Sequence, residues 1–187
     1  MMVPVVFQLI YNEFDSTFIT SGIITITFGI LFFLSNIDHL KLINTQQAFL
    51  LTALSWLCIA TFGSLPFFFS QLDLSITDSF FESMSGITTT GATILNNIES
   101  SPKGILMWRS MLQWLGGIGV ILMAITLMPI MNIGGMQLLK ITSYDTSEKI
   151  LPKSKEVSLR LITVYLSLTA LCAVFYKIFG MNAFDSI

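Results

Sequence analysis

The sequence predicts an all-α membrane protein with a helix–pore-loop–helix repeat of the potassium-channel type, and three observations support this fold class. Hydrophobic residues make up 53% of the 187 residues and charged residues only 11%, with a mean hydropathy of +0.79. Soluble domains do not have this composition. Four apolar segments are long enough to cross a bilayer. Between the second and the third of them, residues 78–95 combine a short helix signal with a Thr/Gly run.

This short segment predicts a re-entrant pore loop. Ser79 followed by Glu82 fits a capping box, so a pore helix should begin near Asp78 and stop at Gly86 after roughly two to three turns. Non-helical backbone is tolerated at membrane depth where protein buries it or water wets it, as in selectivity filters. The run Thr88–Ala92 would then offer main-chain carbonyls to a dehydrated monovalent cation. The alternative is an ordinary helix that ends in a polar surface turn.

The apolar segments follow one another along the chain, and only the first is too short to cross a membrane. Residues 1–11 amount to roughly half a span and lack the basic start and cleavage site of a signal peptide. In the second long segment, Pro66 lies near the end, where a proline costs least. The predicted spans are Thr17–Leu34, Ala48–Phe69, Gly104–Ile133 and Val157–Gly180.

Small residues and one charge distinguish the third span. Gly116 and Gly117 would let another backbone, or the pore loop, approach closely, although generic helix packing explains them almost equally well. Arg109 lies several residues inside the span, where a charge is costly unless it faces protein or reaches the headgroups. Two interpretations of Arg109 therefore stay open, namely snorkelling to the headgroups and a salt bridge in an outer vestibule.

The distribution of charges orients the predicted spans. Segment 134–156 carries four lysines and Arg160 follows it closely, whereas the segments beside the pore loop carry mainly acidic residues. The positive-inside rule makes segment 134–156 a cytoplasmic loop, so the pore loop enters and leaves from outside. An acidic outer mouth would raise the local cation concentration. We therefore expect a multi-pass protein of the cell (inner) membrane.

Composition argues against several other classes of function. The net charge is −2, and the absence of a basic cluster with interleaved aromatic residues argues against a nucleic-acid partner. Acidic residues are scattered over connecting segments without a catalytic arrangement, so we expect neither an enzyme nor a covalently bound cofactor. Cys58 and Cys172 lie in apolar segments without metal-ligand spacing, which predicts buried, inert thiols.

Several motifs together resemble those of a known family. They are Pro66-Phe-Phe-Phe69, the stretch from Thr77 to Thr93, Arg109-Ser-Met-Leu-Gln-Trp-Leu-Gly-Gly-Ile-Gly119 and Gly134-Gly-Met-Gln-Leu138. This set resembles the first third of the Trk/Ktr/HKT potassium transporters, and most closely the membrane subunit of bacterial Trk systems. The resemblance implies a pathway of four helix–pore-loop–helix repeats in one polypeptide, with the potassium ion as transported substrate.

The resemblance also implies roles for single residues. Thr89, Thr90 and Gly91 would be filter positions whose backbone carbonyls hold potassium, with Thr88 and Ala92 beside them. In such transporters a glycine at the position of Gly91 goes with potassium preference, and a serine goes with sodium permeation.

The chain would correspond to a fragment with about one complete repeat. The implied regions are an N-terminal extra helix region (1–47), the first repeat (48–133), a cytoplasmic loop (134–156) and the truncated first helix of a second repeat (157–187). An internal echo agrees with this division, because Ala183–Ile187 repeats the register of Ile76–Phe80, as if a second pore helix began there.

Two functional hypotheses of different class remain. The first is potassium uptake across the cell membrane, with coupled proton or sodium movement (symport) as an option. The family resemblance adds a cytosolic nucleotide-binding regulatory subunit and a homodimer as partners, besides the lipid bilayer. The second is a non-conducting membrane fragment that acts only in assembly or interaction, because one repeat cannot close a pore. Three further filter loops in the downstream reading frame would favour transport.

Overall fold

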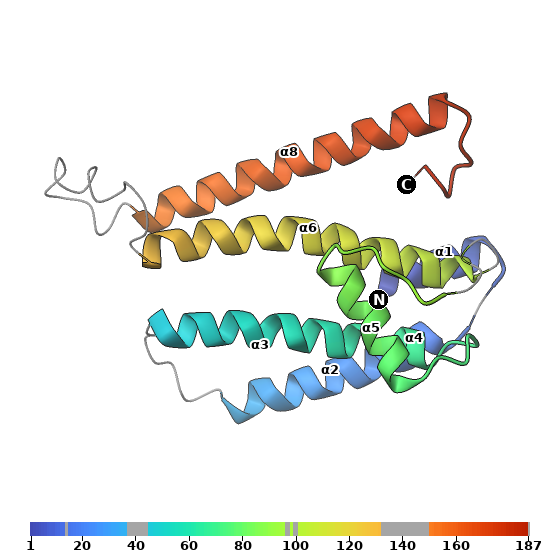
Figure 1. Ribbon diagram of the computed structural model, residues 1–187, viewed down its shortest axis with the longest axis horizontal. Helices are drawn as coiled ribbons and strands as arrows, with labels where there is room; N and C mark the ends of the chain where they lie inside the picture. Colours follow the sequence, from blue (N-terminus) through green and yellow to red (C-terminus); the bar gives the residue numbers. More distant parts are fainter. Residues whose placement is uncertain (14, 37–44, 96–97, 99–100, 132–149, 187) are drawn as a thin grey trace, which may run out of the picture. The chain divides into compact units, whose positions relative to one another are not determined.

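The computed structural model of the protein describes residues 1–13, 15–36, 45–95, 98, 101–131 and 150–186. Within these ranges the regular structure is helical, as Figure 1 shows. The chain divides into two compact units, residues 1–119 and 120–187, and one long helix runs from the first unit into the second. The helices are α1 (Met2–Ile10), α2 (Thr17–Ser35), α3 (Thr45–Gly63), α4 (Leu65–Phe68), α5 (Ile76–Ile87), α6 (Lys103–Met131) and α8 (Ile150–Ile178).

Four helical segments of the described chain are long and apolar enough to cross a membrane, namely Thr17–Ser35, Gln46–Phe68, Lys103–Met123 and Glu156–Ile178. They confirm the four predicted spans and the all-α membrane fold class. Large apolar side chains such as Phe32 and Phe33 are exposed along them, as expected of surfaces that a bilayer covers. Cys58 and Cys172 are exposed as well. Their predicted burial is wrong, because lipid can cover an apolar helix face as well as protein can.

The second span is broken near its end, where α3 ends at Gly63 and α4 begins at Leu65. Pro66 has no N–H group and cannot continue the hydrogen-bond ladder of α3. At the break, the carbonyl oxygen of Gly63 accepts a hydrogen bond of 2.9 Å from Trp108 Nε1 of α6. The indole therefore ties the end of the second span to the third, and the break lies beside α5, because a Cβ atom at Gly63 would lie 2.6 Å from the Ser83 hydroxyl oxygen.

α8, described here by itself, begins earlier than the sequence predicts. It starts at Ile150 rather than at Val157, so the end of the predicted loop 134–156 is helical. A helix can include this stretch because its one proline, Pro152, falls in the first turn, where a missing N–H group costs little. The remainder of that loop lies outside the described residues. Its cytoplasmic location stays a prediction.

Helix α5, the predicted pore helix, begins and ends at other residues than the sequence predicts. Its N-cap is Ser75, whose hydroxyl accepts a hydrogen bond of 3.1 Å from the backbone N–H of Asp78, while the Asp78 carboxylate accepts from the Ser75 N–H at 3.4 Å. The predicted capping box of Ser79 and Glu82 is wrong, because both residues already lie inside the helix. The helix also continues past Gly86 and ends at Ile87.

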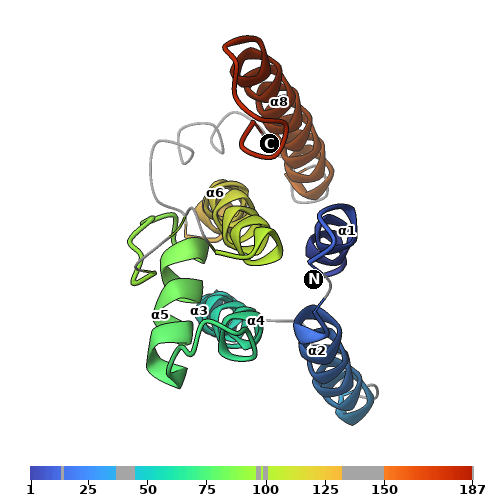
Figure 2. The same cartoon turned by 90° about the vertical axis from the view of Figure 1, so that its right-hand side faces the viewer.

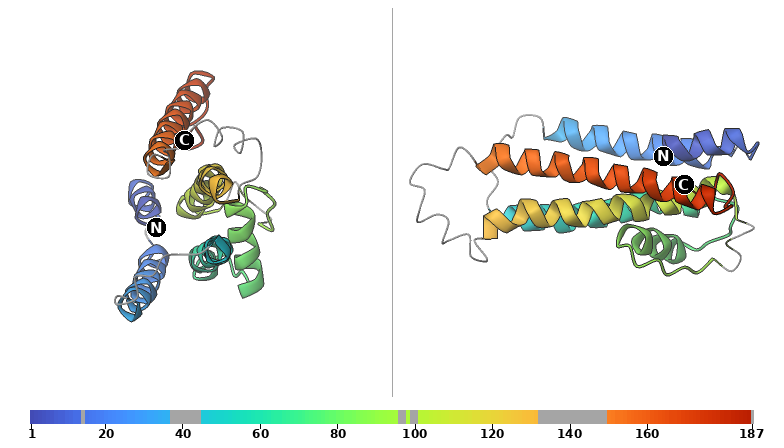
Figure 3. Two further views of the ribbon diagram at one scale, coloured as in Figure 1. Left: turned by 90° about the vertical axis from the view of Figure 1, so that its left-hand side faces the viewer. Right: turned by 90° about the horizontal axis from the view of Figure 1, so that it is seen from above.

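The buried core of the first unit gathers around α5. This helix of 12 residues packs against α3, of 19 residues, and against α4. Figure 2 and the left view of Figure 3 look along α3 and show that α5 runs across it. Apolar residues from α2 to α6 form the core, namely Phe18, Ala60, Phe67, Ile87, Ile105, Trp108 and Leu112. The buried face of α5 itself is largely polar, with Ser79, Glu82, Ser83 and Ser85. Buried polar groups need hydrogen-bond partners, and the partners of Glu82 and Ser85 define the candidate site.

Residues 183–186 form a turn after α8. Within it the backbone N–H of Ser186 donates to the carbonyl oxygen of Asn182 at 3.0 Å. The predicted second pore helix at Ala183–Ile187 stays a prediction, since Ile187 lies outside the described residues.

Candidate functional site

The segment that follows α5, here called the filter loop (Thr88–Leu95), turns its first N–H groups back onto the helix. The backbone N–H groups of Thr88–Gly91 donate to carbonyl oxygens of Met84, Ser85 and Gly86, over 2.9 to 3.4 Å. In a trans peptide the carbonyl points opposite to the N–H of the same unit. The carbonyls of Thr88, Thr89 and Thr90 are therefore directed away from the end of α5. Such a row of carbonyls can serve as ligands for a cation.

Two residues of the filter loop have a left-handed backbone. Thr89 has φ of +58° and Gly91 has φ of +75°. Glycine adopts this conformation readily, whereas a β-branched residue such as threonine pays roughly 1–2 kcal/mol for it. The sequence prediction that Gly91 needs a conformation opposed by a Cβ atom is confirmed by its φ. The strained Thr89 was not foreseen, because a threonine gives no signal of positive φ.

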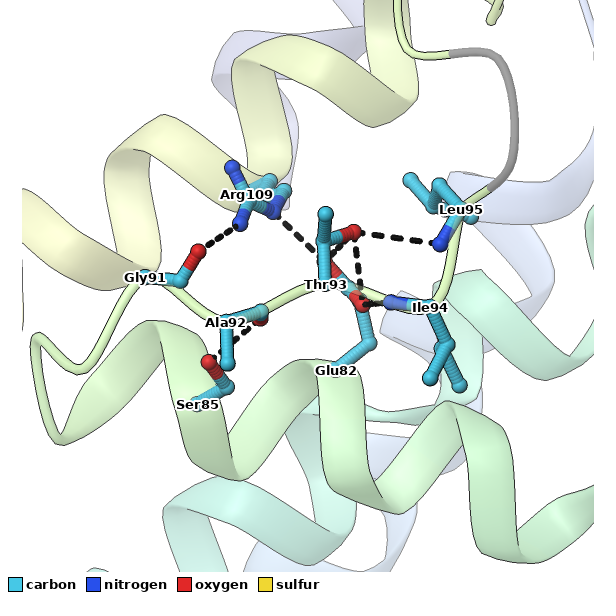
Figure 4. A network of polar contacts seen from close by, with 8 residues as sticks. All are labelled: Glu82, Ser85, Gly91, Ala92, Thr93, Ile94, Leu95 and Arg109. Carbon is cyan, nitrogen blue, oxygen red and sulfur yellow. Dashed lines mark hydrogen bonds and ion pairs between the residues drawn. The ribbon is translucent and has the colours of Figure 1, made fainter.

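Glu82 is the centre of a polar network that Figure 4 shows. Its side chain is fully buried, and its Oε1 atom pairs with Nε of Arg109 at 2.5 Å. The hydroxyl of Thr93 donates to Oε1 at 2.9 Å and lies 3.1 Å from Oε2, and the backbone N–H of Ile94 donates to Oε2 at 3.2 Å. Both carboxylate oxygens therefore have partners, as a buried charge requires.

Arg109 joins this network to the filter loop. Of the two interpretations left open by the sequence, the structure shows a salt bridge, and the partner is Glu82 of α5. A second group of the guanidinium, Nη2, donates to the carbonyl oxygen of Gly91 at 2.8 Å. The Gly91 carbonyl oxygen, predicted as a potassium ligand, therefore already accepts a hydrogen bond from the Arg109 guanidinium.

The predicted filter residues differ in what holds their carbonyls. The Ser85 hydroxyl donates to the carbonyl oxygen of Ala92 at 2.6 Å, and Arg109 holds that of Gly91. Within the described residues, no hydrogen bond to the carbonyl oxygens of Thr89 and Thr90 is found. The same holds for the carbonyl oxygen of Thr88, so all three carbonyls of the row are available as cation ligands.

A close backbone contact fixes α6 against the end of α5. A Cβ atom at Gly116 would lie only 1.9 Å from the carbonyl oxygen of Ile87, whereas one at Gly119 would lie 3.6 Å from the Trp56 ring. Any side chain at position 116 would force the two helices apart. The predicted close approach of another backbone is confirmed for Gly116, where that backbone is the end of α5, and for Gly117 it stays a prediction.

The structure also adds residues that the sequence prediction did not include. Ser85 and Thr93 were not chosen as site residues, although each binds the filter loop or its support. The spacing of Ser85 could have indicated its role, because Glu82 and Ser85 are three residues apart and therefore share a face of α5. Of the serines on the buried face, Ser79 and Ser83 have hydroxyl oxygens with no hydrogen-bond partner in the described part of the chain.

These features define an all-helical membrane protein in which a short helix and its returning loop stand between two spanning helices, the arrangement of helix–pore-loop–helix proteins. Residues 15–186 match the family model TrkH, described as a cation transport protein. The chain therefore belongs to this family, and the family explains the resemblance already noted in its motifs.

Individual relatives agree with the family. Over its full length the chain is 37% identical to the Trk system potassium uptake protein TrkH of Vibrio parahaemolyticus and to that of Escherichia coli K12. Over 75% of its length it is 43% identical to the Trk system potassium uptake protein TrkI of Halomonas elongata. The chain spans 39%, 40% and 29% of the lengths of these three proteins, respectively.

Proposed function

We propose that the chain forms the first pore repeat of a potassium uptake pathway, with the filter loop contributing one part of a selectivity filter. The observation that carries this proposal is the row of carbonyls at Thr88–Thr90, which the hydrogen bonds of the Thr89–Gly91 N–H groups direct away from α5. The names of its relatives supply the ion, because they are potassium uptake proteins.

In this proposal the ligands of potassium are the carbonyl oxygens of Thr89 and Thr90. Gly91 contributes through its backbone, since its positive φ allows the loop to turn at that position. A dehydrated potassium ion needs ligands from several loops at once, so the filter is completed by further repeats. Proton or sodium movement coupled to uptake, a cytosolic nucleotide-binding regulatory subunit and a homodimer belong to the same proposal.

The experiment is a chimera. The chain replaces the matching segment of the Escherichia coli relative, which it covers to 40%, and potassium uptake is measured in cells that lack their own uptake systems. We expect uptake above that of cells with an empty vector. The non-conducting alternative predicts a chimera that reaches the membrane in normal amount and leaves uptake at the background level.

A variant of the chimera locates the pathway at the filter loop. Thr90→Lys would place a fixed positive charge beside the proposed ligands, and we expect it to abolish uptake by repelling cations. Asn36→Lys is the control, because it adds the same charge at an exposed residue just beyond the first of the four spans. Uptake by Thr90→Lys equal to that of Asn36→Lys would exclude the filter loop from the pathway.

A further inference from the structure

Four consecutive residues of the filter loop are each held by a side chain from α5 or α6. Arg109 binds the carbonyl oxygen of Gly91, and Ser85 binds that of Ala92. Glu82 accepts hydrogen bonds from the Thr93 hydroxyl and from the backbone N–H of Ile94. The first part of the loop, Thr88–Thr90, is held to α5 through its backbone N–H groups and through the Thr88 hydroxyl, which donates to the carbonyl oxygen of Met84 at 2.7 Å. Side chains of α5 and α6 therefore fix the loop from Gly91 to Ile94.

Glu82 is the residue on which most of these contacts depend. It binds two of the four residues directly, and it holds the guanidinium that binds a third (Figure 4). Its side chain is 0% exposed and that of Arg109 is 16% exposed. A helix cap would instead lie at the first turn, where Ser75 and Asp78 serve. The chain therefore uses a buried carboxylate for something other than starting the helix.

The charge of Glu82 matters as much as its hydrogen bonds. Arg109 donates to Gly91, next to the carbonyls that would bind the cation. A positive guanidinium at this position would repel a cation unless a negative charge offsets it, and the repulsion would be strong because the pair is largely shielded from water. Glu82 lies 2.5 Å from the Arg109 Nε atom and supplies that negative charge.

We propose that Glu82 is a positioning residue for ion selection: its carboxylate neutralises Arg109 and, through Arg109, Thr93 and Ile94, fixes the filter loop at Gly91. This inference rests on the proposed function. Glu82 does not touch the ion. It acts by setting where the Thr89 and Thr90 carbonyls stand and by removing the field of the guanidinium.

The test uses three variants of the chimera described above, with the ratio of potassium to sodium uptake as the readout and membrane amount measured in parallel. Glu82→Gln leaves the Arg109 charge unbalanced, and we expect at least a tenfold loss of potassium uptake and a lower ratio. Glu82→Gln with Arg109→Gln removes both charges, so uptake should recover in part while the ratio stays low. Glu156→Gln is the matched control, because its ion pair with Arg160 is exposed.

A structural role alone makes a different forecast. It predicts that protein which reaches the membrane keeps the parent ratio of potassium to sodium in all variants, and this result would overturn the inference. If Glu82→Gln fails to reach the membrane, Glu82→Asp and Thr93→Val decide the question. Glu82→Asp keeps the negative charge, so it should keep part of the parent ratio of potassium to sodium uptake. Thr93→Val removes one hydroxyl donor and should lower that ratio two- to threefold. Parent ratios in both variants would again overturn the inference.

The two proposals fail in distinguishable ways. A parent chimera that takes up no potassium removes the proposed function, and the inference about Glu82 falls with it. A parent chimera that takes up potassium, combined with an unchanged ratio in every Glu82 variant, removes the inference and leaves the proposed function in place.

Discussion

Two ion pairs of the same chemistry lie in different surroundings in this protein. Glu82 and Arg109 approach to 2.5 Å, and Glu156 and Arg160 approach to 2.6 Å. The side chains of the first pair are 0% and 16% exposed, and those of the second are 60% and 76% exposed. Distance therefore does not separate them, but burial does. A buried pair is costly to break because the remaining charge stays unpaired, whereas water solvates the partners of an exposed pair.

The partners of each pair differ in the same way. The Glu82–Arg109 pair joins two helices and binds the filter loop at Gly91, Thr93 and Ile94. The Glu156–Arg160 pair joins neighbouring turns of one helix. The first pair therefore organises tertiary structure, while the second adds a local contact within one helix.

The largest expected effect comes from removing one member of the buried pair. Arg109→Ala leaves Glu82 buried without its counter-charge, which costs about 3–5 kcal/mol. Arg109→Lys keeps a positive charge but lacks the planar fork that reaches both Glu82 and Gly91, so we expect it to assemble better than Arg109→Ala and still to transport less than the parent. Thermal stability in detergent measures the loss of folding stability, and potassium uptake measures the loss of transport. Wild-type behaviour of both variants would place the side chain at the headgroups.

A second prediction tests the frame that brings the buried pair together. Gly116→Ala puts a Cβ atom about where the Ile87 carbonyl oxygen now lies, 1.9 Å away, so α6 must move away from the end of α5. Overpacking of this kind costs roughly 1–3 kcal/mol or more. Gly119→Ala is the matched control, since its Cβ would make an ordinary contact of 3.6 Å with Trp56. Equal melting temperatures of the two variants would argue against the close crossing.

The spans and the position of the filter loop could be predicted from the sequence, whereas the network of side chains that holds the loop could not. Hydropathy alone identified the spans. Gly91 and Gly116 were informative because glycine adopts a positive φ without strain and leaves room for a close backbone contact. The cap was mistaken because Ser75-Ile-Thr-Asp78 and Ser79-Phe-Phe-Glu82 both fit the pattern of a capping box. The structure has Ser75 and Asp78 as the cap, while Glu82 pairs with Arg109, a tertiary contact that the capping pattern does not include.

The third prediction concerns selectivity beside the buried pair. Gly91→Ser adds a side chain at φ of +75°, and a Cβ atom there has 3.6 Å to the Gln113 amide nitrogen. There is space for the side chain, so the cost is conformational, and we expect normal membrane insertion with a several-fold lower preference for potassium over sodium. Ion flux in both cations, on chimeric protein confirmed to be in the membrane, measures it. An unchanged ratio would count strongly against a filter at this position.

The smallest effect is expected at the exposed pair. Glu156→Gln removes one charge of an i, i+4 pair on α8, and such pairs contribute about 0.3–0.5 kcal/mol. For a chain of this size, that corresponds to a shift of roughly 1–2 °C in the melting temperature. Added salt should erase even this shift, because salt screens exposed charges and leaves a buried pair nearly unaffected.

Double-mutant cycles on both pairs, at low and at high salt, make the comparison quantitative. Glu156→Gln and Arg160→Gln should be nearly additive and should lose their remaining coupling in salt. Glu82→Gln and Arg109→Gln should be strongly non-additive at either salt concentration, since the second change removes the charge that the first left unpaired. If the exposed pair showed a coupling as large and as insensitive to salt as the buried one, burial would not be the property that separates them.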